Sequence, residues 1–403
     1  MHSLQSARWW VAGLVLVTAV AVCAVFAQGG RGGRGGVQIQ PGQECPPGMT
    51  MTRPGNCQAP EFPPPSIVDY RPRSTMVTSE HPVPKAKYPV VDSHNHTTIN
   101  ANNIEQMIKE MDALNLRVLV NLSGGDAAAV KSKVDFLRGT KYADRFRVFA
   151  NVNWTSADAP GWATRAVTDL RQAVANGAVG LKIAKNLGMG TRRTDGTRQK
   201  VDDPGLKPIW DLCAELNIPV IIHTGEPQEF FSPLDMHNER WLELALFRDR
   251  RHYMDGEPTF AELMGERDRM YKANPKTRYI GAHFNWYGNN LGKTAKQLDE
   301  TPNLVLEVAA VLYDFGRQPR GAREFFIKYQ DRILFGKDSY SAEEYPYYWR
   351  VFETTDEYFD YYRDYHAFWK LYGMDLPDAV LKKLYYANAL KITPGLPKDG
   401  WPR

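Results

Sequence analysis

From residue 88 onward, the chain alternates short apolar runs with longer stretches of helical periodicity. Each apolar run is only a few residues long and is bounded by turn residues, which is typical of strands buried on both faces of a parallel sheet. Eight such runs follow one another along the chain: 89–92, 117–122, 147–152, 178–183, 219–223, 278–283, 303–308 and 333–338. The pattern therefore predicts eight strands.

The stretches between these runs have apolar residues three and four positions apart, which predicts helices with one buried face. The first such set is Ile104, Met107, Ile108, Met111 and Leu114. A second set, Ala166, Val167, Leu170, Ala173 and Val174, is followed by Gly177 as a helix stop. Eight strand-then-helix units predict an α/β fold, a (β/α)8 TIM barrel. A doubly wound open sheet is the alternative, but no G-x-G-x-x-G motif follows any predicted strand.

The start of the chain has a different composition and hydropathy pattern. Arg8 precedes an uncharged apolar run over residues 9–27, which ends in small and branched residues. This pattern predicts a signal peptide over residues 1–27 and an exported protein, periplasmic or secreted. An uncleaved membrane anchor is the alternative, because the run is long enough to span a bilayer.

Residues 28–87 are rich in glycine and proline and are expected to be a linker before the barrel domain, 88–395. An Arg-Gly run at 29–36 is interpreted as a solvated spacer, since it directly follows the export signal. Cys45 and Cys57 lie in this segment, and an oxidising compartment would let them pair. Cys213 falls in a helical pattern and is expected to be a buried apolar residue.

Composition narrows the function classes. The chain has 403 residues, of which 43% are hydrophobic and 24% charged, so it is globular rather than disordered. Its 50 basic and 46 acidic residues give a net charge of only +4, which does not fit a dedicated nucleic-acid binder. Four cysteines are too few for a disulfide scaffold.

Residues 345–372 are dense in aromatic side chains interleaved with acids and bases. The segment is expected to form a helix that packs on the barrel with its aromatic face. A subunit interface, and hence a homo-oligomer, is the alternative, because aromatic residues anchor interfaces.

Metal-type residues fall where the predicted strands end, the place where barrels build their active sites. His94 and His96 end the first strand, and residues two apart on a strand face the same side. His223 ends the fifth strand, His283 the sixth and Asp338 the eighth. Neutral imidazoles and one carboxylate suit a divalent transition metal with positions left open for water.

Five motifs together resemble the amidohydrolase superfamily, and more closely its amidohydrolase-related branch of decarboxylases and lactonases. They lie at 91–96, 179–183, 222–226, 281–283 and 334–338, in the family's order, within a resemblance over about residues 88–395. Each motif alone is weak, but the set is specific. The resemblance implies a metal-dependent enzyme with a TIM-barrel fold.

The resemblance also implies residue roles. His94, His96, His223 and Asp338 would hold one metal, usually zinc and sometimes manganese. His283 would be the acid/base beside the metal, and Asp338 would share in proton transfer. Lys182 is expected to face the pocket and to bind an anionic group of a small-molecule substrate. The alternatives are a carbamylated Lys182 that bridges two metals, or a plain salt-bridged lysine.

Other residues near the strand ends are expected to shape the pocket: Trp154, Arg192, Arg193, Glu226, Asn285, Trp286, Tyr287 and Glu307. The long insertion at 229–274 is interpreted as a lid or a contact surface. Lys337 departs from the family pattern, because it stands beside the predicted ligand Asp338. Neighbours on a strand face opposite sides, so Lys337 is expected to point away from the metal.

Two reactions use this ligand set. The first hypothesis is a hydrolase in which metal-activated water attacks an ester, lactone or amide. The second is a carboxy-lyase that removes carbon dioxide from an aromatic or muconate-like acid without oxidation. A non-catalytic exported barrel would need no metal, and a glycosidase would need two carboxylates where the strand ends offer histidines.

Overall fold

The structure is a computed structural model that describes residues 36–63, 65–366 and 369–402. The chain divides into two compact units, Met1–Arg71 and Pro72–Arg403. The predicted signal peptide lies outside the described residues and stays a prediction. Within the described residues, no helix combines the length and the apolar character needed to cross a membrane.

The first unit contains a small antiparallel sheet inside the segment expected to be a linker. Its strands are β1 (Val37–Gln38), β2 (Thr50–Arg53) and β3 (Asn56–Gln58), with β3 in the centre. A disulfide joins Cys45 to Cys57, the pair that the sequence allowed. Cys57 is fully buried, so this crosslink takes the place of a larger apolar core.

The second unit is built on nine short parallel strands that are buried along nearly their whole length. They are β4 (Val90–Asn95), β5 (Leu116–Asn121), β6 (Phe146–Val148), β7 (Ala150–Asn151), β8 (Leu181–Ile183), β9 (Val220–Ile222), β10 (Tyr279–Gly281), β11 (Leu304–Glu307) and β12 (Ile333–Leu334). Every predicted run overlaps one of them, and β6 and β7 together form the third predicted strand, interrupted at Phe149.

These strands close into a barrel. One sheet has the order β4-β5-β6 and the other the order β7-β8-β9-β10-β11-β12, all parallel. The last strand returns to the first through a parallel bridge between Asn95 and Asp338. Two backbone hydrogen bonds flank it: the Ser93 N–H donates to Phe335 O at 2.9 Å, and the Asp338 N–H to His94 O at 2.7 Å. The predicted TIM-barrel architecture is confirmed.

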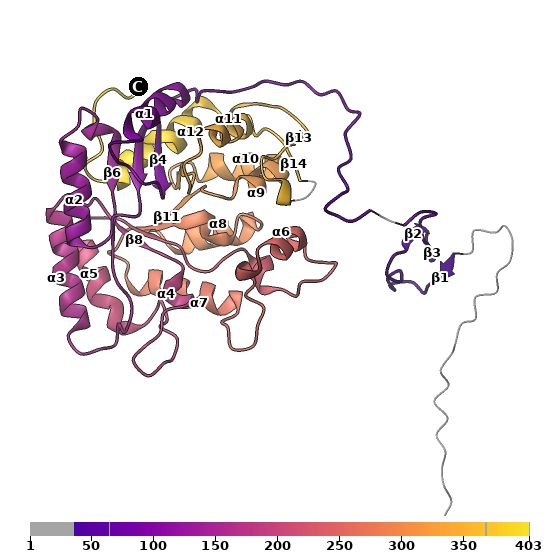
Figure 1. Cartoon of the computed structure of the whole chain (residues 1–403), viewed down its shortest axis with the longest axis horizontal. Helices are drawn as coiled ribbons and strands as arrows, with labels where there is room; N and C mark the ends of the chain where they lie inside the picture. The colour runs from indigo at the N-terminus through magenta and orange to yellow at the C-terminus, as the bar shows by residue number, and fades with distance from the viewer. Residues whose placement is uncertain (1–35, 64, 367–368, 403) are drawn as a thin grey trace, which may run out of the picture. The chain divides into compact units, whose positions relative to one another are not determined.

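Helices follow the strands and cover the outside of the barrel (Figure 1). The covering helices are α1 (Ile104–Leu114), α2 (Ala127–Arg138), α3 (Trp162–Ala175), α5 (Lys207–Glu215), α7 (Phe260–Ala273), α8 (Leu291–Glu300), α10 (Pro319–Lys328), α12 (Asp378–Lys382) and α13 (Asn388–Ile392). All five apolar residues of the first predicted helix are buried in α1. The remaining α-helices are α4 (Asn186–Met189), α6 (Trp241–Leu246), α9 (Leu312–Arg317) and α11 (Tyr345–Glu353).

The aromatic segment is helical only in its first part. In α11, Tyr345, Tyr348, Trp349 and Phe352 are buried in this unit, as expected for a helix that packs on the barrel. The chain then leaves the helix at Thr354 and forms an antiparallel pair, β13 (Phe359–Asp360) with β14 (Lys370–Leu371). The prediction of one long helix is wrong for this second part, and the homo-oligomer stays a prediction.

Candidate functional site

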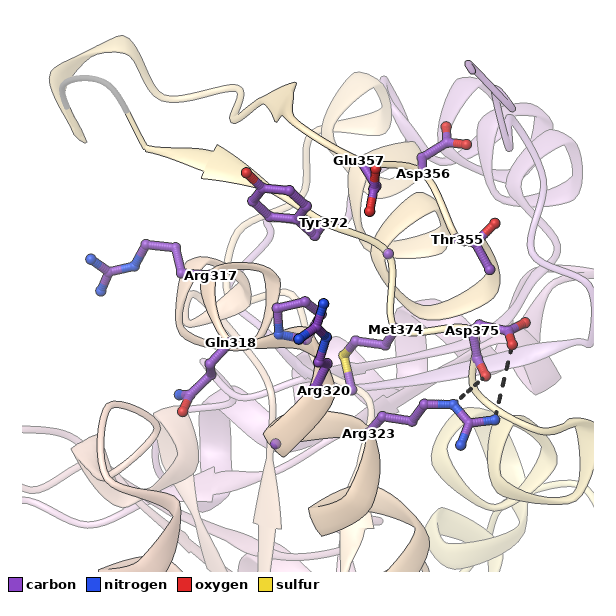
Figure 2. Close-up of a pocket in the computed structure, with 13 residues that line it drawn as sticks. Arg317, Gln318, Arg320, Arg323, Thr355, Asp356, Glu357, Tyr372, Met374 and Asp375 are labelled. Carbon is purple, nitrogen blue, oxygen red and sulfur yellow. Dashed lines mark hydrogen bonds and ion pairs between the residues drawn. The ribbon is translucent and has the colours of Figure 1, made fainter. Parts of the chain in front are cut away.

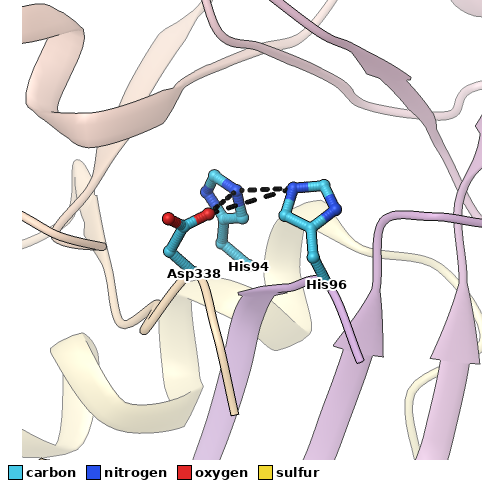
Figure 3. Close-up of side chains that lie close together, drawn as sticks. All are labelled: His94, His96 and Asp338. Atoms are coloured by element: carbon cyan, nitrogen blue, oxygen red, sulfur yellow. Dashed lines mark hydrogen bonds and ion pairs between the residues drawn. The ribbon is translucent and has the colours of Figure 1, made fainter. Parts of the chain in front are cut away.

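The predicted site residues meet at the carboxyl ends of the barrel strands. His94 lies in β4 and Lys182 in β8. His223 directly follows β9, while His283 and Asp338 lie a few residues beyond the ends of β10 and β12. Figure 3 shows His94, His96 and Asp338 turned toward one another. Because parallel strands end at one rim of a barrel, residues that are far apart in sequence share this position.

Nε2 of His94 is the centre of the cluster. It lies 3.2 Å from Nε2 of His96, 3.2 Å from Oδ1 of Asp338 and 3.1 Å from Nζ of Lys182. Nε2 of His96 is also 3.9 Å from Asp338 Oδ1. Three of the four predicted ligands therefore present one ligand atom each to a common point, within 4.8 Å of one another.

The other ring nitrogens of the two histidines already have partners. Nδ1 of His94 lies 2.9 Å from Oε1 of Glu307, and Nδ1 of His96 lies 2.8 Å from Oγ of Ser123. These contacts orient both rings so that Nε2 faces the cluster. Metal-binding histidines are typically held in this way through the nitrogen that does not bind the metal.

With a charged Lys182, no proton arrangement satisfies all contacts of His94 Nε2. If Nε2 carries a proton, that N–H faces the Lys182 ammonium, and two donors meet. If Nε2 is bare, it faces the Asp338 carboxylate, and two acceptors meet. A divalent cation between the imidazoles and the carboxylate removes the second conflict, and a neutral Lys182 amine, favoured by its lowered pKa, removes the first. The residues present therefore fit a metal.

His223, the fourth predicted ligand, lies beside His283. Nδ1 of His223 is 3.2 Å from Nε2 of His283, and the His283 ring also contacts His94, with ring centres 4.9 Å apart. Nε2 of His223 is buried and has no hydrogen-bond partner among the described residues, although Glu226 Oε2 lies 3.6 Å away. An unpartnered buried nitrogen next to the cluster fits the role of a ligand.

The electrostatics favour neutral imidazoles at three of the four histidines. Burial, reinforced by His94 and Lys182, lowers the pKa of His96 to about 3. Burial also lowers the pKa of His223 and of His283. Only the neutral ring offers a lone pair to a metal.

His94 and Asp338 shift in opposite directions. Burial alone would lower the pKa of His94, but Glu307 and Asp338 raise it above its ordinary value. Burial alone would raise the pKa of Asp338, but His94 holds it well below its usual range. Asp338 is therefore a carboxylate at neutral pH, which is the form that binds a cation.

Lys182 reaches the cluster rather than the surrounding cavity. Its side chain is buried, its amine contacts His94 Nε2, and burial lowers its pKa to about 8. Lys337 points elsewhere: it forms an ion pair with Glu344 and lies over the rings of Tyr345 and Tyr348. The Lys337 side chain thus points away from the cluster that Asp338 faces, as the sequence predicted.

The loop after β10 has an unusual backbone. His283, Phe284, Asn285 and Trp286 all have φ between 54° and 56°, in the left-handed region that side chains other than glycine rarely adopt. Arg267, fully buried in α7, donates to the Asn285 carbonyl at 2.8 Å. Tyr271 donates to the Asn285 side chain at 3.1 Å. This left-handed turn brings the Trp286 ring onto His283, with ring centres 4.6 Å apart.

A cavity of about 250 Å³ opens beside the cluster, and His223, His283 and Asp338 form part of its wall. The insertion supplies Phe230, Arg240 and Arg250, which agrees with a covering role. Glu226 and Trp286 also line this cavity, as expected for residues that shape a pocket.

The other residues expected to shape the pocket do not line this cavity. Trp154 packs against Trp162 and Trp210, and Arg193 forms an ion pair with Asp203. Glu307 lies behind His94. Arg192, Asn285 and Tyr287 are also absent from the cavity wall.

A larger cavity of about 700 Å³ lies elsewhere, between the start of α10 and residues 355–375 (Figure 2). Its wall includes Arg317, Arg320 and Arg323, and Arg323 is ion-paired with Asp375. None of the predicted site residues lines this larger cavity, so the smaller one is the candidate active site.

Comparison with known proteins adds a family. A family model described as "Amidohydrolase" matches residues 91–393. A search of curated proteins finds no match.

Solved structures with a similar fold include an uncharacterised TIM-barrel protein from Bordetella bronchiseptica, with 15% identity over 75% of this chain and 98% of that one and a TM-score of 0.49. A 2,6-dihydroxybenzoate decarboxylase from Rhizobium has 16% identity, 76% and 98% coverage and a TM-score of 0.47. A dihydroxybenzoic acid decarboxylase from Polaromonas sp. JS666, with bound manganese and the inhibitor 2-nitroresorcinol, has 14% identity, 76% and 96% coverage and a TM-score of 0.48.

Proposed function

The chain belongs to the amidohydrolase family and is a metal-dependent enzyme, and from this premise we propose that it hydrolyses an ester, lactone or amide bond of a small molecule. The observation that carries the proposal is the convergence of His96, Asp338 and Lys182 on Nε2 of His94. A bound divalent ion supplies Lewis acidity there, which polarises a carbonyl and lowers the pKa of water.

We propose zinc as the resident metal and manganese as the alternative. Imidazole nitrogens suit zinc, and a carboxylate among the ligands leaves manganese possible. His94, His96 and Asp338 would hold the ion, with His223 as the fourth ligand.

His283 is the proposed proton acceptor. Its Nδ1 lies 2.9 Å from the carbonyl oxygen of Ala309, so Nδ1 carries the proton and Nε2 is bare in the neutral ring. Burial keeps the pKa of His283 low, which keeps the ring neutral at working pH. His283 then takes a proton from the attacking water at Nε2 and returns it to the leaving group, with the Asp338 carboxylate as a second proton carrier.

A second candidate is non-oxidative decarboxylation of an aromatic or muconate-like acid. Four aromatic side chains, Phe230, Trp286, Tyr313 and Tyr365, line the cavity and would stack on a flat unsaturated substrate. In this reaction the C–C bond to the carboxylate breaks, its electron pair stays on the ring or chain carbon, and carbon dioxide leaves. That carbon then takes up one proton, which comes from water and is relayed by His283 or Asp338.

One experiment separates these candidates. The purified enzyme is analysed for metal, stripped with a chelator and reloaded with zinc or manganese. It is then assayed on matched lactones and esters for proton release, on amides for release of ammonia or amine, and on aromatic acids for carbon dioxide release. Release of protons, ammonia or amine without carbon dioxide supports the hydrolase, and carbon dioxide release supports the lyase. Full activity of the stripped protein would overturn both.

We also propose export to the periplasm or the medium. The apolar run at 9–27 and the Cys45–Cys57 disulfide both fit an oxidising compartment. Sequencing the N-terminus of the natural protein tests this proposal: a mature chain that begins near Gln28 supports cleavage, and an intact Met1 in a soluble fraction contradicts it.

A further inference from the structure

Four basic side chains line the candidate active-site cavity: Lys185, Arg240, Arg250 and Arg363. Three of them already have acidic partners. Arg240 and Arg250 each donate to the Glu243 carboxylate at 2.6 Å, and Lys185 is paired with Glu226. Each of these three side chains therefore has an acidic partner before any substrate binds, although Arg240 and Arg250 share the Glu243 carboxylate.

Arg363 differs from the other three. Among the residues that the structure describes, its guanidinium has no ion pair and no hydrogen-bond acceptor. The rings of Tyr362 and Tyr365 flank it, with centres 5.5 and 6.0 Å from its central carbon. Burial raises the pKa of Tyr362, so its phenol is neutral and does not balance the charge. Of the four basic side chains in the cavity wall, Arg363 is therefore the one without an acidic partner among the described residues.

A backbone hydrogen bond supports the turn that begins at Arg363. Its carbonyl accepts a hydrogen bond from the His366 N–H at 3.0 Å. His366 is buried, and its Nε2 lies 3.3 Å from the Glu243 carboxylate in the insertion. This contact joins the insertion to the loop that carries Arg363.

We propose that Arg363 binds an anionic group of the substrate, a carboxylate, and makes the enzyme select small acids over their neutral analogues. Guanidinium and carboxylate pair through two parallel hydrogen bonds, and an unpartnered arginine in a shielded pocket gains most from such a pair. The cavity is below the usual size range of drug-like sites, so the acid is small. Arg363 takes the role first expected of Lys182, whose amine contacts His94 and does not line the cavity.

This inference rests on the proposed function only in placing the reaction at the same cavity, so its test measures binding. Benzoate and benzamide serve as a matched acid and neutral probe, titrated by calorimetry into the zinc-loaded wild type and the variants Arg363→Gln and Arg363→Lys. We expect Arg363→Gln to weaken benzoate binding by about 10- to 100-fold, the effect of losing a charge-assisted hydrogen bond, and to leave benzamide within about threefold. The benzoate affinity of Arg363→Lys should fall between those of the wild type and Arg363→Gln, because lysine keeps the charge but cannot form the two parallel hydrogen bonds of a guanidinium.

Arg250→Gln is the matched control, since Arg250 lines the same cavity but is paired with Glu243. It should change benzoate and benzamide binding by similar factors. Equal benzoate affinity in the wild type and Arg363→Gln, with both proteins folded by circular dichroism, would overturn the inference and leave the proposed function standing. Arg363-dependent benzoate binding without turnover of any substrate in the panel would overturn the function instead.

Discussion

Oε1 of Glu307 lies 2.9 Å from Nδ1 of His94, and the same carboxylate accepts hydrogen bonds from the backbone N–H groups of His283 and Ala309, each at 2.6 Å. Glu307 is completely buried. Burial alone would raise its pKa, but His94 and His283 hold the pKa below its ordinary value. One buried carboxylate thus positions both a proposed metal ligand and the start of the turn that carries the proposed acid/base.

Glu307→Gln should weaken metal binding. The amide keeps the size of the side chain but removes the charge that orients and polarises His94, and losses of this kind cost about 10- to 100-fold in metal affinity. Competition with a coloured chelator measures the zinc dissociation constant. Glu353→Gln is the control. It makes the same change in a half-buried carboxyl whose partner is the Tyr385 hydroxyl and not a histidine of the site. Unchanged zinc affinity in Glu307→Gln would show that this contact has no part in the metal site.

His96→Ala and His283→Ala should separate metal binding from proton transfer. His96 presents Nε2 to the cluster, so its removal should lower the metal content of the purified protein and abolish turnover. His283→Ala should keep the metal and lose about 10²- to 10⁴-fold in turnover, the usual contribution of a general base. Elemental analysis and a kinetic assay on the same preparations give both numbers. Metal loss from His283→Ala would make His283 a ligand instead.

Gly281→Ala should disturb the left-handed turn. A Cβ at Gly281 would lie 2.3 Å from Oδ1 of Asn285, so the turn must move or the side chain must leave its contacts with Tyr271 and Gln297. We expect a loss of about 1–3 kcal/mol in unfolding free energy, as for other overpacked sites, and lower turnover with metal retained.

Gly265→Ala is the control for this substitution, and it should change the unfolding free energy in the opposite direction. In Gly265→Ala, within α7, the new Cβ meets only the flexible end of Arg269 at 3.3 Å. Alanine favours a helix over glycine by roughly 1 kcal/mol, so this variant should gain stability. If both variants unfold at the same denaturant concentration as the wild type, the contact between a Cβ at Gly281 and Asn285 does not affect stability.

The barrel was predictable because its signals are local. Each buried run is bounded by turn residues, and the faces of helices such as α1 repeat at helical spacing. The meeting of His94, His96 and Asp338 follows from topology, since parallel strands place their ends at one rim.

Other features carry no local signal. The Glu307–His94 contact joins residues 213 positions apart, so the sequence pointed to Glu307 only as a residue near a strand end. The turn at 283–286 has no glycine to mark its positive φ angles. The aromatic residues after Glu353 match a helix in composition. The pairing of β13 with β14 joins residues about ten positions apart, and local periodicity gives no signal for such a pair.

Asp314→Asn should change how stability depends on pH. Asp314 is buried, and this burial raises its pKa from 3.8 to about 7 despite Arg240 and Arg317, the latter 3.5 Å away. Between these two pH values the folded protein binds more protons at this site than the unfolded chain, so the carboxyl lowers stability as pH rises through the window. The cost is absent below about pH 4 and complete above about pH 7, where it reaches at most about 4 kcal/mol.

Asparagine has no charge to bury, so Asp314→Asn should be more stable than the wild type at pH 8, with an advantage that shrinks toward pH 4. Urea unfolding of both zinc-loaded proteins at pH 4.5, 6 and 8 measures this difference. A variant that is less stable than the wild type at pH 8 would mean that the carboxylate is charged and stabilised by its arginine neighbours.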